Sequence, residues 1–270
     1  MKQLFLTFCF FLLLISVYAN DHPFQSGEEL TFDIHYKYGL VMIKAGSANY
    51  KLVGSNYNQN DSYLSTIDFK TNPFFDKIFK MRDTLSSQMT INLLPLYHVR
   101  SVYEGHYHFR EEMFINKFTK NHSEIRLIRK SGEILKIDTI LTANTESYDM
   151  LNLIHLIRSF DYSQTASQQA RNATAFVGRD KIPVIVRYEG QSVVEKSETL
   201  KYKTYKIALD FADEAFTESK SAIEVWVSDD ENRIPIKIRA KLRIGAVEIY
   251  LSSWKNLKHP FDSEIKIPVR

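Results

Sequence analysis

The clearest pattern in the chain is a strict alternation of apolar and charged residues between Ile234 and Ile244. The charged positions, here called the basic row, are Lys237, Arg239, Lys241 and Arg243. Because successive side chains of a strand point to opposite faces, the pattern predicts one long strand with a buried face and a basic face. Turn residues at 229–232 precede it and Gly245 follows it, so we expect three consecutive antiparallel strands over Ile223–Trp254.

Similar alternation predicts strands along most of the remaining chain. The predicted strands are Leu30–Tyr36, Val41–Val53, Tyr63–Phe69, Asp83–Leu93, His98–Phe109, Glu112–Phe118, Glu124–Arg129, Ile134–Leu141, Ala175–Phe176, Ile182–Tyr188, Val193–Leu200 and Tyr202–Phe211. The second of them contains the small residues Ala45, Gly46 and Ala48. Small residues within a strand often mark strong curvature or a close backbone approach.

Two segments follow the helical period instead. A short helix is expected near 73–80, because proline is favoured in a first helical turn and phenylalanines follow at helical spacing. A second helix near 147–160 is apolar on most sides, so we expect it to be buried in the concavity of a sheet. Asn144, Thr145 or Ser147 is its expected N-cap, with Asp149 in its first turn. The polar stretch 163–174 is expected to be an exposed connection.

These elements predict a mainly β fold with one large curved antiparallel sheet. The alternation of strands and helices that builds parallel α/β sheets is missing. An open barrel, a half-barrel and a β-roll all remain compatible with the pattern. Residues 20–270 are expected to form a single β-rich domain.

The N-terminus predicts export. Lys2 and Gln3 precede an apolar run from Leu4 to Val17, and Ala19 completes the small-residue pattern that a signal peptidase recognises. We therefore interpret 1–19 as a signal peptide, since the run is short for a membrane span; a signal anchor is the alternative. The expected location is the periplasm, either free or peripheral to a membrane, with no transmembrane segment in the mature chain.

Composition narrows the possible chemistry. The one cysteine of the sequence, Cys9, lies inside the predicted signal peptide, so the mature chain would have no thiol for a disulfide, a metal or nucleophilic catalysis. The formal net charge of +3 falls to +2 when Lys2 is removed, which gives no indication of nucleic-acid binding. We expect no cofactor.

Three segments in order resemble domain-of-unknown-function family 3108, a family of exported proteins of Gram-negative bacteria. They are Phe24-x-x-Gly27-Glu28-x-Leu30-x-Phe32 with the strand that contains Gly46, the helix Asp149-Met150-Leu151-Asn152 through Arg158, and Trp226-Val227-Ser228-Asp229-Asp230-x-x-Arg233-Ile234-Pro235. The resemblance implies a periplasmic location and a β-rich fold but no established reaction. In outline the chain is also similar to the half-barrel carriers that move lipoproteins or lipids across the periplasm.

One candidate metal site stands out in the sequence. Glu104, His106 and His108 would share one face of the predicted strand His98–Phe109, and imidazole and carboxylate groups on one face can meet a zinc ion. The alternative is a solvated polar face opposite an aromatic one, which is favoured because Arg110 would lie on the same face and oppose a cation.

Two further sets of residues could bind an anion. The basic row could meet phosphates of an envelope lipid, an anionic polysaccharide or an acidic protein, or else pair with Glu224 and Glu248 on neighbouring strands. Arg158 lies on the polar side of the buried helix, where it needs a carboxylate or carbonyl partner or, alternatively, an anionic ligand head group. Asp229 and Asp230 are interpreted as turn residues, with Arg233 paired to one of them.

The sequence shows no nucleophile elbow and no phosphate-binding loop, so we expect a non-catalytic protein. The leading hypothesis is an exported protein that binds an apolar or amphiphilic envelope component in an aromatic-lined concave sheet. The alternative is a structural or interaction protein of the envelope whose core is filled, with an envelope protein as its partner. A hydrolase of envelope polymers is the third hypothesis.

Overall fold

The computed structural model describes residues 22–162, 170–211 and 222–267. The predicted signal peptide, 1–19, lies outside these ranges, as does the first part of the stretch 163–174. The rest of that stretch is not the exposed connection that the sequence predicts, because a strand begins at Ala170 and its residues Ala173 and Thr174 are buried.

Sixteen strands are found among these residues. They are β1 (Glu29–Tyr38), β2 (Val41–Tyr57), β3 (Asn60–Thr71), β4 (Arg82–Thr90), β5 (Pro95–Glu104), β6 (Tyr107–Thr119), β7 (His122–Ser131), β8 (Ile134–Ala143), β9 (Ser147–Tyr148), β10 (Ala170–Val177), β11 (Asp180–Ser197), β12 (Leu200–Phe211), β13 (Ile223–Ser228), β14 (Pro235–Lys241), β15 (Ala246–Lys255) and β16 (Glu264–Lys266). The helices that the structure describes are the 3-10 helix η2 (Phe75–Lys77) and α2 (Met150–Arg158).

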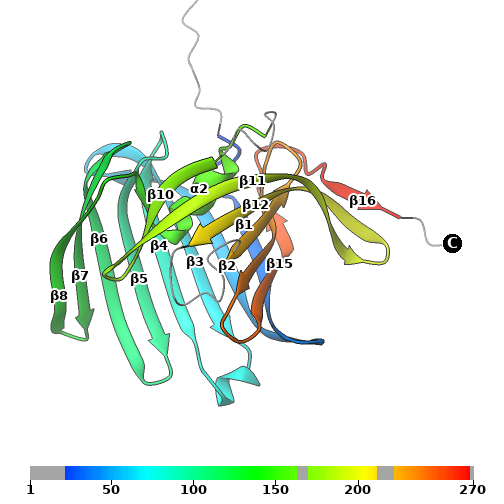
Figure 1. Ribbon diagram of the computed structural model, residues 1–270, viewed down its shortest axis with the longest axis horizontal. Helices are drawn as coiled ribbons and strands as arrows, with labels where there is room; N and C mark the ends of the chain where they lie inside the picture. The colour runs from blue at the N-terminus through cyan, green and yellow to red at the C-terminus, as the bar shows by residue number, and fades with distance from the viewer. Residues whose placement is uncertain (1–21, 163–169, 212–221, 268–270) are drawn as a thin grey trace, which may run out of the picture.

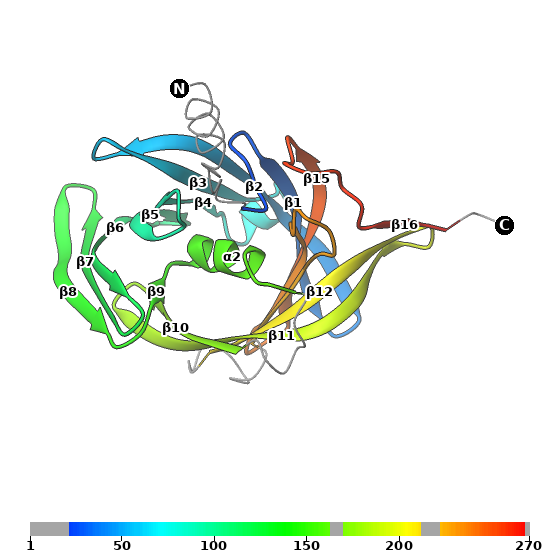
Figure 2. The ribbon, with the colours of Figure 1, turned by 90° about the horizontal axis from the view of Figure 1, so that it is seen from above.

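The strands form one sheet that curves into a nearly closed barrel, which confirms the predicted mainly β fold. The order runs from β8 down to β1, then β15 down to β9, with β16 beside β12. Almost all neighbours are antiparallel; β9 and β10 are parallel. Figure 2 shows the wall curving around α2. Where the two edges of the sheet meet, Phe176 of β10 packs on Leu127 and Ile137 of β7 and β8, so side chains close the seam.

The barrel has two different ends. Alternate connections of an antiparallel sheet lie at the same end, and those between β1 and β2, β3 and β4, β5 and β6, and β7 and β8 lie at the lower end in Figure 1. We call this the open end. The helix α2 lies near the other end, together with residues 22–28 and the turn 229–234, and we call this the closed end. Leu153 and Ile157 of α2 pack on Val184 and Ile207 of the wall.

Several predicted boundaries are wrong for identifiable reasons. The predicted strand His98–Phe109 is interrupted by a hairpin turn at Gly105, whose φ of 58° suits glycine. The long strand Ile234–Ile244 ends at Lys241, where a turn leads to Gly245 with a φ of 74°. The N-cap of α2 is Asp149, because Ser147 is in β9.

The close approach predicted from small residues in β2 is present at Gly46. A Cβ added there would lie 2.2 Å from the carbonyl oxygen of Lys70 on β3. No side chain fits at that distance, so the backbones could not keep their spacing. The close spacing of β2 and β3 at this point therefore requires glycine.

Replacing Gly46 with alanine is expected to lower the free energy of unfolding by about 1–3 kcal/mol, the usual cost of forcing extra atoms into a packed site. Urea unfolding monitored by tryptophan fluorescence would measure it. Gly54→Ala on the same strand is the control, because the nearest atom to its added Cβ is 3.5 Å away. Equal unfolding midpoints for the two variants would contradict this account of Gly46.

Candidate functional site

The closed end is held by a buried ion pair between α2 and the segment before β1. The guanidinium of Arg158 donates to both carboxylate oxygens of Glu28 at 2.6 and 2.8 Å. It also donates to the carbonyl of Asn232 at 2.9 Å and lies 5.0 Å from the centre of the Phe24 ring. Because Arg158 is 1% exposed and Glu28 is 0% exposed, this arginine is committed to protein partners rather than facing a ligand.

The turn at 229–234 completes the closed end. Asp230 accepts hydrogen bonds from the hydroxyl of Ser228 at 2.7 Å and from the backbone N–H of Asn232 at 3.0 Å, as a turn-forming aspartate does. The predicted ion pair of the Arg233 side chain with a turn carboxylate is wrong. Its guanidinium donates instead to the carbonyls of Arg158 and Phe160, because the last carbonyls of a helix lack partners within the helix.

A second polar cluster joins α2 to the wall. The hydroxyl of Ser87 donates to Asp149 Oδ1 at 2.6 Å and lies 2.9 Å from His98 Nδ1. Asp149 also accepts the backbone N–H groups of the first helical turn. In a catalytic triad the histidine lies between the serine and the carboxylate. Here the serine bonds the carboxylate directly, so the cluster fixes the start of α2 on the wall. No motif or spacing in the sequence predicts that these three residues lie together.

The space between α2 and the open end is a cavity, which we call the lumen. Its volume is about 660 Å³, within the roughly 300–1,000 Å³ typical of small-molecule sites. Met150 of α2 faces it from the closed end, and Phe75 and Phe79 line it near the open end. One wall is apolar, and its residues include Ile34, Phe211, Ile223, Val247 and Ile249. The lumen therefore offers mostly apolar surface to an occupant.

The opposite wall of the lumen carries charged groups from β4, β5 and β6. Glu111 accepts hydrogen bonds from the guanidinium of Arg129, so its charge is compensated. Burial raises the pKa of Glu104, and the neighbouring carboxylate of Asp83 raises it further, since two adjacent carboxylates resist double ionisation. Glu104 therefore holds its proton more readily than a free carboxylic acid in water, and the negative charge of this wall is reduced.

Arg100 is the exception on this wall. It lies directly opposite Glu111 in the β5–β6 ladder, but Arg129 holds that carboxylate. Among the residues that the structure describes, no carboxylate forms an ion pair with Arg100 and no acceptor takes a hydrogen bond from it. Its guanidinium lies 5.5 Å from the centre of the Phe109 ring and lines the lumen. A partly buried guanidinium that forms no ion pair can bind a carboxylate or phosphate.

The three residues of the candidate metal site do not come together. Glu104 lines the lumen at the end of β5, His106 is in the hairpin turn, and His108 is exposed on β6 beside Tyr103. The turn at Gly105 separates them, whereas the prediction required one continuous strand. No group of three metal-ligating side chains is found within 22–162, 170–211 and 222–267.

The basic row is divided between the outer wall and the open end. Lys237 Nζ lies 3.1 Å from Glu248, and the guanidinium of Arg239 lies 3.6 Å from Glu248 and 3.7 Å from Glu224. These two cations are therefore paired with the neighbouring strands. Lys241 ends β14, and Arg243 is exposed in the turn that follows.

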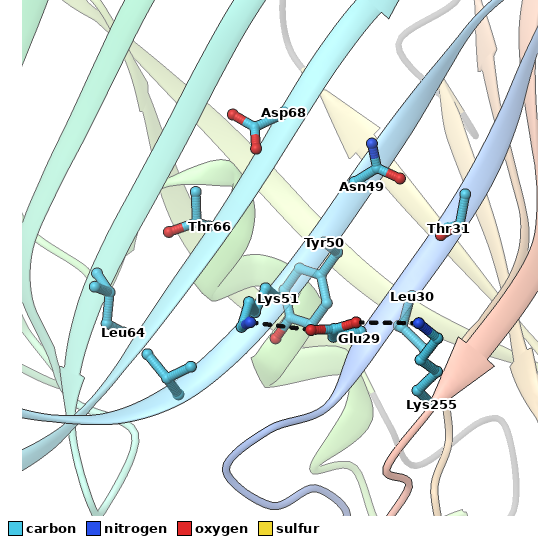
Figure 3. Close-up of a pocket in the computed structure, with 11 residues that line it drawn as sticks. Glu29, Leu30, Thr31, Asn49, Tyr50, Lys51, Leu64, Thr66, Asp68 and Lys255 are labelled. Carbon is cyan, nitrogen blue, oxygen red and sulfur yellow. Dashed lines mark ion pairs between the residues drawn. The ribbon is translucent and has the colours of Figure 1, made fainter.

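The outer wall also bears a hollow of about 600 Å³, shown in Figure 3. Its centre is Glu29, whose carboxylate lies 3.0 Å from Lys51 and 3.9 Å from Lys255. A hydrogen bond from Lys51 lowers the pKa of Glu29. This hollow is charged, open to water and internally paired, so the lumen is the better candidate site for an apolar ligand.

Comparison with known proteins supports the fold but assigns no activity. The family model for DUF3108, described as a protein of unknown function, matches residues 31–252. No curated protein matches the sequence. Among solved structures, the beta-barrel-like protein of domain of unknown function DUF1849 from Brucella abortus is similar, with a TM-score of 0.55 and 12% identity over 86% of this chain and 98% of that chain. At this identity the likeness concerns the fold alone.

Replacing Glu28 with glutamine is expected to destabilise the protein by about 3–5 kcal/mol, because it leaves the buried charge of Arg158 uncompensated. Urea unfolding would measure the change. The matched control is Glu29→Gln, since the adjacent carboxylate forms only solvent-exposed ion pairs and its loss should leave the unfolding midpoint close to that of the wild type. Similar midpoints for both variants would show that the Arg158 pair does not hold the closed end.

Proposed function

This chain belongs to the DUF3108 family of proteins of unknown function, and we propose that it is a non-catalytic exported protein that binds an anionic amphiphile in its lumen. The proposed ligand has an acyl chain and a carboxylate or phosphate head group. The proposed location is the periplasm, supported by the signal-peptide pattern at 1–19. None of the helices in the described part of the chain is both long and apolar enough to cross a bilayer.

The observation that carries the proposal is Arg100 beside an apolar lumen. A filled core would have supported a purely structural protein, whereas a cavity of about 660 Å³ leaves room for a ligand. An acyl chain would lie along Ile34, Val247 and Ile249, and its head group would meet the guanidinium across the lumen. The head group would then form the ion pair with Arg100 that no carboxylate of the described residues forms.

The apolar wall accounts for most of the proposed affinity. Each methylene group moved from water into an apolar site contributes about 0.8 kcal/mol. Affinity should therefore rise by about fourfold for each methylene in a fatty-acid series, until the chain fills the lumen. The charge on Arg100 instead selects the head group, because a desolvated guanidinium discriminates between a carboxylate and a neutral alcohol.

Replacing Arg100 with methionine is expected to weaken fatty-acid binding at least tenfold and to leave binding of the matching fatty alcohol nearly unchanged. Displacement of a fluorescent fatty acid from the purified protein would measure both affinities. The control is Arg126→Met, because Arg126 is paired to Asp138 on the outer wall at 2.8 Å. Equal losses in the two variants would place the head group elsewhere than at Arg100.

Native mass spectrometry tests the proposal independently of the choice of probe. Protein purified from its own envelope without detergent should carry a bound anionic lipid that organic extraction removes. A spectrum without ligand, together with no displacement by any fatty acid, would contradict binding in the lumen. A structural or interaction role would then be the better account of the barrel.

A further inference from the structure

The exposed apolar residues of this protein are concentrated on the connections at the open end. We define the rim as segments 37–44, 74–80, 103–108, 130–136, 177–181 and 241–245. These 38 residues carry fourteen of the twenty-one large hydrophobic side chains that are exposed within the described ranges. Leu40, Phe74, Ile78, Ile134 and Ile244 are each more than 60% exposed. Apolar side chains gathered at one end of a soluble fold mark an interaction surface.

The rim is also basic. Its segments contain ten lysines and arginines against four carboxylates, an excess of six positive charges in a chain whose formal net charge is +3. Lys37 and Lys44 pair with Glu248 and Asp33 on the wall, and without them the excess is still four. The remainder of the chain therefore carries a net negative charge, and the described rim is the positive end.

The outer wall differs from the rim in how its charged side chains are arranged. Its charged side chains pair across neighbouring strands, as in Lys51 with Glu29, Arg126 with Asp138 and Arg187 with Asp210. Apolar side chains and cations are therefore found together in one ring around the opening of the lumen. Phe79 belongs to the rim and also lines the lumen. This arrangement is typical of surfaces that enter the headgroup layer of a membrane.

We infer that the rim docks the barrel, open end first, on an anionic lipid bilayer. The apolar tips enter the boundary between headgroups and acyl chains, and the lysines and arginines meet lipid phosphates. A second copy of the chain is a poorer partner, because two rims of the same charge repel each other. The docking depends on the rim alone and goes beyond the proposed function, since it does not require that the lumen hold a ligand.

The first test places a tryptophan at each end of the barrel. Leu40→Trp carries the probe on the rim, and the matched control Leu94→Trp carries it in the exposed turn between β4 and β5 at the closed end. Vesicles of phosphatidylglycerol with brominated acyl chains should quench the probe at position 40. They should quench Leu94→Trp no more than the wild type, whose two tryptophans provide the background. Equal quenching of the two variants would overturn the proposal.

The second test measures co-sedimentation with vesicles. Wild-type protein should bind phosphatidylglycerol vesicles at least tenfold more tightly than phosphatidylcholine vesicles, with the difference reduced by salt. Leu40→Ser with Ile244→Ser, and separately Lys77→Gln with Lys80→Gln, should each weaken binding at least tenfold, whereas Ile91→Ser with Leu94→Ser at the closed end should not. A wild-type protein that binds neither vesicle but forms dimers that Leu40→Ser dissociates would overturn the proposal in favour of self-association.

The two proposals fail in different experiments. Arg100→Met should keep its vesicle binding, because Arg100 lies inside the lumen, and Leu40→Ser should keep its affinity for a soluble fatty acid. Loss of vesicle binding in Arg100→Met would overturn the assignment of docking to the rim. Docking is also measured on protein stripped of lipid, so an empty lumen would leave the result unchanged.

Discussion

The structure depends on one buried ion pair, between Arg158 and Glu28. It joins the last residue of α2 to the segment that leads into β1, so two parts of the chain 130 residues apart meet at the closed end. The three segments that carry the family resemblance converge here, because the turn that contains Asn232 offers its carbonyl to the same guanidinium. A buried charge pair stabilises a fold only where all its polar groups have partners. The guanidinium of Arg158 donates five hydrogen bonds, to Glu28, Asn232 and Pro23.

The ion pair that fixes α2 at the closed end also determines the shape of the lumen between the helix and the open end. A barrel of fifteen consecutive strands encloses more volume than its own inward side chains fill. With α2 fixed near one end, the unfilled volume lies between the helix and the open end. The cluster of Ser87, His98 and Asp149 fixes the other end of the helix, so both termini of α2 are fastened to the wall. The lumen is therefore a consequence of how the helix is held.

Local pattern predicted the strands and the buried helix, because alternation and helical period are properties of short segments. It predicted one large curved sheet but did not choose between an open barrel, a half-barrel and a β-roll, since closure depends on twist and register accumulated over the whole sheet. The continuous strand that the metal hypothesis assumed is broken at Gly105, where one glycine turns an apparent strand into a hairpin. Arg100 was missed because nothing in its spacing shows that Glu111, opposite it, would be taken by Arg129.

If the lumen holds the proposed ligand, the position of the helix also decides at which end of the barrel that ligand is exchanged. An acyl chain that leaves the lumen through water exposes every methylene, at about 0.8 kcal/mol each, and the closed end is filled by α2 and its ion pair. The remaining route passes Phe79 and the rim. If the rim lies against a bilayer, the chain moves between two apolar environments and its head group moves between Arg100 and the basic tips. The anchoring of α2 creates the lumen and fills the closed end. A ligand in the lumen would therefore be exchanged at the rim.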